Sequence, residues 1–224
     1  LFWRCVLEGY ANDTYMDFDG KNKDFLRFNG KDSFVEIPST RKIRNITTRE
    51  HTVSVLVRAQ QQEEKVPIYL IGDEERRFVE YPIFRRPGYD WGLSYNNSRA
   101  YTTQLWNNEG EHLYQWMKRY ENIWTWITMV VDEGKIHLYM NGKESDARWG
   151  TGTASPQYFQ GHLKRYGNTS FYLGTTTSVS DNDISKWFKG DIADLKIWNR
   201  TLSKEEVSEL SNNPTNDGLS LHYD

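Results

Sequence analysis

Apolar and polar residues alternate along many short segments of this chain, with the period of half-buried β-strands. Residues 124–142 give the clearest example, because an Asp-Glu-Gly turn joins two alternating segments there and Asn141-Gly142 closes the second. A β-hairpin is therefore predicted over these residues. Its aliphatic side chains share one face: Ile127, Met129 and Val131, opposite Ile136, Leu138 and Met140.

Further strands are predicted where the same alternation meets Gly, Pro or Asn-Gly. Segments 25–28 and 33–37 flank Asn29-Gly30, which predicts a second hairpin. Long helical periodicity is almost absent, so the pattern favours an antiparallel sandwich over βαβ units. The other predicted strands cover residues 52–59, 66–71, 89–95, 101–106, 171–174 and 191–198.

One short helix is predicted after the last of these strands. Ser203 and Glu206 have the spacing of a capping box, in which each side chain bonds the backbone N–H of the other residue. Val207 and Leu210 then fall on one face, and Asn212-Asn213-Pro214 ends the helix. The predicted fold class is all-β, a two-sheet antiparallel sandwich with one short C-terminal helix.

Composition narrows the class of partner. The length of 224 residues suits one sandwich domain. Hydrophobic residues make up only 37% of the chain, so the aromatic residues, at 15%, must supply much of the core. A net charge of −3 without a basic run predicts no nucleic-acid binding. Cys5 is the single cysteine, so no internal disulfide can form. No apolar run approaches the roughly 20 residues of a membrane span.

Three segments in order resemble the laminin G-like domains of the concanavalin A-like superfamily: Leu26–Pro38, Trp124–Gly142 and Phe188–Ser203. The first carries Phe-Asn-Gly and an apolar alternation ending in Pro, the second a Tyr-x-Asn-Gly close, and the third Gly-x-Ile followed by Asn-Arg-Thr-Leu-Ser. The chain departs from the family pattern at Asn29, where Asp is common. Ala193, inserted before Asp194, leaves open the face to which Asp194 points.

This resemblance covers roughly residues 24–211, so residues 1–23 are predicted to be a lead-in segment and residues 212–224 a tail. It implies a two-sheet jelly roll whose members bind glycans or extracellular proteins, often with one Ca²⁺. Fold alone does not fix function, so function has to come from sites.

Glycoside hydrolysis requires two carboxylates that converge across the scissile bond. Asp191 and Asp194 are three residues apart on a predicted strand, so they are expected to face opposite sides. The five histidines have no spacing that suits a metal or a catalytic triad. The chain is therefore expected to be non-catalytic. A polysaccharide-cleaving enzyme stays a remote alternative, because such enzymes share the fold.

Candidate Ca²⁺ ligands are carboxylates in acidic clusters, because Ca²⁺ takes six to eight oxygen ligands. Asp181 and Asp183 alternate in a predicted loop, Asp19 belongs to an acidic N-terminal cluster, and Asp194 is a candidate by family analogy. Acidic turns are also common without a metal, because Asp and Asn bond their own backbone.

A sugar site would combine exposed aromatic rings with a few polar groups. Core packing is the alternative for every aromatic residue here, and Trp124 and Trp198 are assigned to the core. The two long polar connections, 73–88 and 145–167, are either binding loops or simple insertions. The candidate platform residues are Trp91, Tyr95, Tyr101, Trp106, Trp116, Trp126, Trp149 and Tyr158.

Glycosylation sequons exceed the number expected by chance and favour a compartment outside the cytoplasm: Asn12, Asn45, Asn96 and Asn168, with Asn199 in a tight turn. The sequence therefore predicts a non-catalytic, lectin-like adhesion module on a secreted, cell-surface or virion-surface protein. Its expected partners are glycans or glycoproteins. The main alternative is a structural module that contacts other proteins in a surface assembly.

Overall fold

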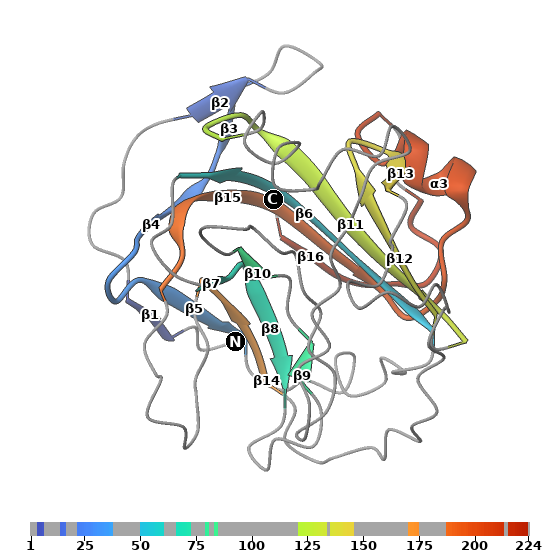
Figure 1. Ribbon diagram of the computed structural model, residues 1–224, viewed down its shortest axis with the longest axis horizontal. Helices are drawn as coiled ribbons and strands as arrows, with labels where there is room; N and C mark the ends of the chain where they lie inside the picture. The colour runs from blue at the N-terminus through green and yellow to red at the C-terminus, as the bar shows by residue number, and fades with distance from the viewer. Residues whose placement is uncertain are drawn as a thin grey trace, which may run out of the picture.

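The computed structural model describes residues 4–6, 14–16, 22–37, 50–60, 66–72, 79–80, 83–84, 121–133, 135–145, 170–174, 187–212 and 215–223. Their strands form two main antiparallel sheets, and the larger sheet arches over the smaller (Figure 1). This arrangement confirms the predicted all-β sandwich. No helix among these residues is long and apolar enough to cross a membrane.

The larger sheet has seven strands, and the predicted hairpin of residues 124–142 forms part of it. Ile127 lies opposite Met140 and Val131 opposite Ile136, as the alternation predicted. β4 (Leu26–Asn29) pairs with the first half of β15. The other six strands follow in spatial order: β13 (Lys143–Ser145), β12 (Lys135–Met140), β11 (Thr125–Asp132), β6 (His51–Ala59), β15 (Lys189–Trp198) and β16 (Leu219–Tyr223).

The smaller sheet has five strands, and two further strand pairs accompany the main sheets. The predicted strand over residues 66–71 is divided in two, with the fully buried Ile68 between the parts. In spatial order the five strands are β1 (Arg4–Val6), β5 (Phe34–Ile37), β14 (Ser170–Leu173), β8 (Tyr69–Gly72) and β9 (Val79–Glu80). The pairs are β7 (Val66–Pro67) with β10 (Ile83–Phe84), and β2 (Thr14–Met16) with β3 (Asn22–Asp24).

Residues 1–23 and 212–224 are predicted to lie outside the sandwich. Each of these two segments contributes a strand that pairs within a sheet of the sandwich. β1 lies beside β5, and β16 lies beside β15. The predicted strands over residues 89–95 and 101–106 lie outside the described residues.

The main core lies between the two sheets. Val53, Val55 and Val57 of β6 are almost completely buried, as their shared face predicted. Phe28 of β4 and Phe188 pack edge to face, with ring centres 6.0 Å apart. Burial of such side chains from water is the main source of stability in a sandwich.

The predicted hairpin of residues 25–37 is wrong. β4 pairs with β15 in the larger sheet, whereas β5 pairs with β1 and β14 in the smaller one. Between them, Asn29 Oδ1 accepts from the backbone N–H groups of Lys31, Asp32 and Ser33, and Gly30 adopts a φ of 76°. The Asn-Gly turn therefore carries the chain from one sheet to the other.

The predicted helix is confirmed as α3 (Lys204–Glu209), with both hydrogen bonds of the capping box present. Val207 and Leu210 face the sheet, where they join Val130, Tyr139, Trp198 and Leu202 in a buried cluster. Trp198 is completely buried, as predicted. Burial raises the pKa of Tyr139 to about 12, with Glu144 and Glu205 adding to the effect, so its phenol stays protonated.

Candidate functional site

The outer face of the seven-stranded sheet is the face opposite the main core, and it carries side chains such as Leu56, Trp126 and Lys196. These residues alternate with Val55, Ile127 and Leu195, which point into the main core. Helix α3 covers one end of the outer face. The other end gathers acidic, basic and aromatic side chains, and this end is the candidate site.

A β-bulge in β15 shapes this end. Two residues of β15, Ala193 and Asp194, lie opposite the single residue Leu56 of β6. Asp191 is in register with Arg58, and Lys196 is in register with Ser54. Arg58 and Ser54 both lie on the outer face of β6. The expectation that Asp191 and Asp194 face opposite sides is therefore wrong, because the extra residue shifts the alternation and brings both carboxylates to the outer face.

Asp194 lies in a buried charged cluster with Lys196. The Lys196 Nζ donates to Asp194 Oδ2 and lies 5.1 Å from the centre of the Trp126 ring. His222 Nε2, from β16, lies 3.2 Å from Asp194 Oδ1 but is not aligned for a hydrogen bond. Asp194 Oδ1 and Trp126 Nε1 are both buried, and neither has a hydrogen-bond partner among the described residues. An acceptor and a donor of this kind are ordinarily satisfied by water or by a ligand hydroxyl.

Asp191 joins three strands through two arginines. Arg27 Nε of β4 donates to Asp191 Oδ1 at 2.9 Å, and Arg58 Nε of β6 donates to Oδ2 at 2.8 Å. The carboxylate is 1% exposed, whereas the Arg27 and Arg58 side chains are 39% and 30% exposed. Asp191 is thus a buried anchor beneath two guanidinium groups at the surface.

Aromatic rings support the same two arginines. Both guanidinium carbons lie over the Phe25 ring, at 5.2 Å for Arg27 and 5.4 Å for Arg58. Arg58 also lies 5.0 Å from the Trp124 ring centre, and the Phe25 and Trp124 rings meet edge to face. Cation–π contacts of this geometry stabilise a guanidinium group in one position.

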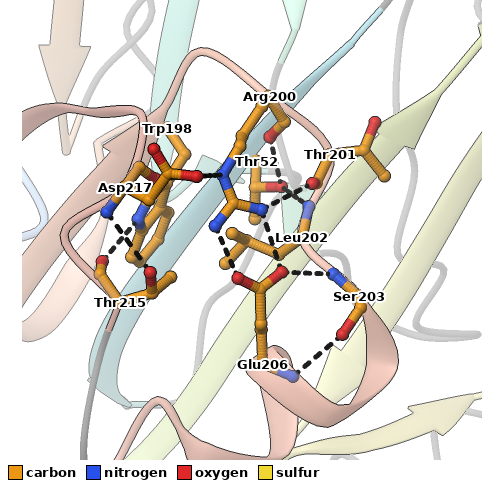
Figure 2. A network of polar contacts seen from close by, with 9 residues as sticks. All are labelled: Thr52, Trp198, Arg200, Thr201, Leu202, Ser203, Glu206, Thr215 and Asp217. Carbon is orange, nitrogen blue, oxygen red and sulfur yellow. Dashed lines mark hydrogen bonds and ion pairs between the residues drawn. The ribbon is translucent and has the colours of Figure 1, made fainter.

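The α3 end of the sheet is closed by a second arginine network, which Figure 2 shows in detail. Arg200 Nη1 and Nη2 donate to the two carboxylate oxygens of Glu206 at 2.9 and 2.5 Å, and Arg200 Nε donates to the Asp217 backbone oxygen. Arg200 holds the pKa of Glu206 below its usual range, against the smaller opposing effect of burial. This network fixes the Asn-Arg-Thr-Leu-Ser turn to α3 and is structural.

Replacing Glu206 with glutamine should lower the free energy of unfolding by about 1 kcal/mol near neutral pH. Because the folded-state pKa of Glu206 is lowered, this contribution is present above the ordinary glutamate pKa of about 4.3 and is lost as pH falls through the folded-state value. Urea unfolding of both proteins at neutral and acid pH measures it. The difference should shrink at acid pH, and Glu209→Gln, exposed on the same helix, should have little effect at either pH.

Two of the predicted site residues lie in the described part of the chain. Trp126 is 5% exposed and packs with Phe25, Leu56 and Ala193, so it takes the core role that the sequence left as its alternative. Asp194 is paired with Lys196. Among the described residues no group of three or more His, Cys, Asp or Glu side chains could hold a metal ion.

The other candidates lie outside the described residues. They are the platform residues Trp91, Tyr95, Tyr101, Trp106, Trp116, Trp149 and Tyr158, the acids Asp19, Asp181 and Asp183, and the sequons at Asn12, Asn45, Asn96 and Asn168.

Sequence reasoning missed the site role of Arg27, Arg58 and Asp191. Each occupies an outer-face position of its strand, and the alternation in β6 does place Arg58 opposite the valines. The meeting of these three residues depends on the register between β4, β15 and β6, which the sequence of any one strand does not contain.

Comparison with known proteins identifies the family. A model described as the concanavalin A-like lectin/glucanase superfamily matches residues 29–208, which is most of the chain. The chain belongs to this superfamily. Its three family signatures, recognised in the sequence, lie in β4–β5, in β11–β12 and in β15 with the turn into α3. None of the curated proteins compared with the chain matches it significantly.

Solved structures similar to this superfamily member include sugar-related proteins. Domain 4 of an extracellular arabinanase from Geobacillus stearothermophilus, in complex with arabinotriose, is 22% identical with a TM-score of 0.57, over 94% of this chain and 87% of that domain. A putative carbohydrate-binding protein from Bacteroides ovatus is 16% identical with a TM-score of 0.55, over 89% of this chain and 51% of that protein.

A Trypanosoma rangeli sialidase with 2,3-difluorosialic acid is 15% identical, with a TM-score of 0.55. The match covers 85% of this chain but 28% of the sialidase, so the chain corresponds to about a quarter of that protein. At these identities the likeness concerns the concanavalin A-like fold.

Proposed function

We propose that the chain is a non-catalytic carbohydrate-binding module that attaches a secreted or surface protein to glycans or glycoproteins. The observation that carries this proposal is membership of the lectin/glucanase superfamily over residues 29–208. The arabinanase domain supports it, because that domain matches almost the full length of both chains and was solved with a bound oligosaccharide.

Two features of the outer face suit a sugar ligand. Rings and charged groups lie side by side at the end away from α3, where the half-buried Trp124 ring lies beside Arg58 and the buried Phe25 ring supports Arg27 and Arg58 from below. Apolar sugar faces pack on rings, and hydroxyl groups need paired donors and acceptors. The platform residues predicted from the sequence, Trp106 foremost among them, remain part of this proposal.

A binding role also fits the chemistry of the two outer-face acids. A glycosidase needs one carboxyl group that gives up a proton and a second that attacks or activates water. Asp191 accepts hydrogen bonds from two arginines, and Asp194 is paired with a lysine, so both carboxylates are engaged by cations. This engagement favours binding over hydrolysis. Ca²⁺ remains a proposed cofactor, with Asp19, Asp181, Asp183 and Asp194 as its proposed ligands.

A glycan array probed with the purified chain, in Ca²⁺ and again in a chelator, tests the proposal. We expect saturable binding to a narrow set of glycans, and a large loss of binding in Trp106→Ala. Tyr172→Ala, on the smaller sheet, serves as a control for an aromatic residue outside the proposed site. Silence across the array in both conditions would contradict the proposal and favour the structural, protein-contacting alternative.

A further inference from the structure

Arg58 is held rigidly on the outer face before any ligand arrives. Its Nε and Nη2 both donate to Asp191 Oδ2, at 2.8 and 2.5 Å, and its guanidinium carbon lies over the Phe25 and Trp124 rings, 5.4 and 5.0 Å from their centres. An arginine fixed in this way has already lost its side-chain freedom, so a ligand that binds it does not bear that entropy cost.

One edge of the Arg58 guanidinium points away from Asp191. The edge formed by Nε and Nη2 serves the carboxylate, so the edge formed by Nη1 and the second N–H of Nη2 is directed elsewhere. Nη1 makes no hydrogen bond within the described part of the chain, and the Arg58 side chain is 30% exposed. The available edge therefore carries two parallel N–H donors that no described residue engages.

The chemistry of this edge selects an anion. Two parallel N–H donors match the oxygens of a carboxylate or sulfate in a bidentate arrangement. Ile123 is 51% exposed in the turn that leads into Trp124, and the Asn122 N–H of this turn donates to the backbone oxygen of Ala59, the residue that follows Arg58.

We infer that the available edge of Arg58 binds the carboxylate or sulfate group of an acidic glycan, while Ile123 and the rim of Trp124 contact the sugar ring. This inference rests on the proposed carbohydrate-binding function and names its ligand class. Arg58 is a direct ligand contact, and Asp191 and Phe25 are positioning residues that hold it.

Calorimetric titration of the full chain with matched acidic and neutral oligosaccharides tests the inference. The pairs are sialyllactose with lactose, an oligogalacturonate with the corresponding galactose oligomer, and a sulfated disaccharide with its unsulfated form. We expect at least one acidic member to bind at least about tenfold more tightly than its neutral partner. Raising NaCl from about 0.05 to about 0.5 M should weaken that binding several-fold.

Variants locate the effect at Arg58. Arg58→Gln should remove most of the preference for the acidic member, and Arg58→Lys should retain only part of it, because lysine keeps the charge but lacks the planar fork. Arg200→Gln is the matched control, since Arg200 is 27% exposed and also bonds a carboxylate, but at the α3 end. It should leave the preference unchanged. If Arg58→Gln does not fold, the preference of Arg58→Lys for the acidic member and the salt series with the wild-type chain test the inference instead.

The outcomes separate this inference from the proposed function. Equal binding of acidic and neutral members would overturn the inference and leave glycan binding in place. Absence of binding to every oligosaccharide would overturn both. Binding to an acidic polypeptide alone would assign Arg58 to a protein partner and likewise overturn the inference.

Discussion

Replacing Gly190 with alanine should lower the free energy of unfolding by about 4 kcal/mol. Gly190 adopts a φ of 151°, which residues with a side chain rarely adopt. A Cβ atom at this position would lie 2.5 Å from the backbone oxygen of Arg58 and 2.7 Å from the Phe188 ring. The neighbouring strand β6 cannot move away without losing its pairing with β15. Urea unfolding of the variant should therefore show the lower free energy of unfolding.

Gly30→Ala is the matched control for backbone conformation. Gly30 also has a positive φ, 76°, but its added Cβ would lie 2.9 Å from the Lys189 Cβ, a milder contact than the 2.5 Å approach to a backbone oxygen at Gly190. We expect a cost of about 1 kcal/mol, mostly from the left-handed backbone. Equal effects in the two glycine variants would show that the close approach of β6 to β15 at Gly190 is not the cause.

Replacing Asp191 with asparagine should lower the free energy of unfolding by about 3 kcal/mol. The substitution preserves size but turns one acceptor oxygen into an amide N–H₂ group that faces a guanidinium group. Arg27 and Arg58 then lose their shared counter-charge, and one of them also loses its hydrogen bond, at a site that is 1% exposed. Chemical unfolding at neutral pH measures the change.

Asp217→Asn tests whether burial of the carboxylate is the reason for the large loss of stability expected at Asp191. Asp217 Oδ2 also lies near an arginine, 3.2 Å from Arg200 Nε, but its side chain is 85% exposed. Because water screens exposed ion pairs, this variant should change stability by less than about 1 kcal/mol. A loss at Asp217 as large as that at Asp191 would argue that arginine pairing, and not burial, sets the cost.

Features determined within one stretch of chain were predicted correctly from the sequence. The turn between β11 and β12 and the capping box of α3 both depend on residues a few positions apart. Trp198 was also placed in the core, and it is completely buried in the cluster beneath α3.

Features determined by pairing between distant strands were not predicted. The Asn29-Gly30 turn looks like a hairpin turn, yet the partner of β4 is β15, more than 150 residues further along the chain. The bulge at Ala193 and Asp194 exists only relative to Leu56 on β6, so strict alternation gave the wrong face for one of the two acids.

The candidate site also combines features that one stretch of chain determines with features that depend on pairing between distant strands. The alternation of the hairpin places Trp126 on the face opposite its aliphatic row, but the burial of Trp126 depends on packing with Phe25, Leu56 and Ala193 from three other segments. Arg58 and Asp191 form an ion pair only because the register between β6 and β15 aligns them. For this fold, residue types and spacing indicate the family, whereas the site emerges from register.

Proton NMR of an oligosaccharide selected from the array, recorded during titration with the chain, tests the central claim of binding without cleavage most directly. We expect saturable broadening of the sugar signals, with the set of anomeric signals unchanged over prolonged incubation. New reducing-end anomeric signals would show hydrolysis and make the chain an enzyme.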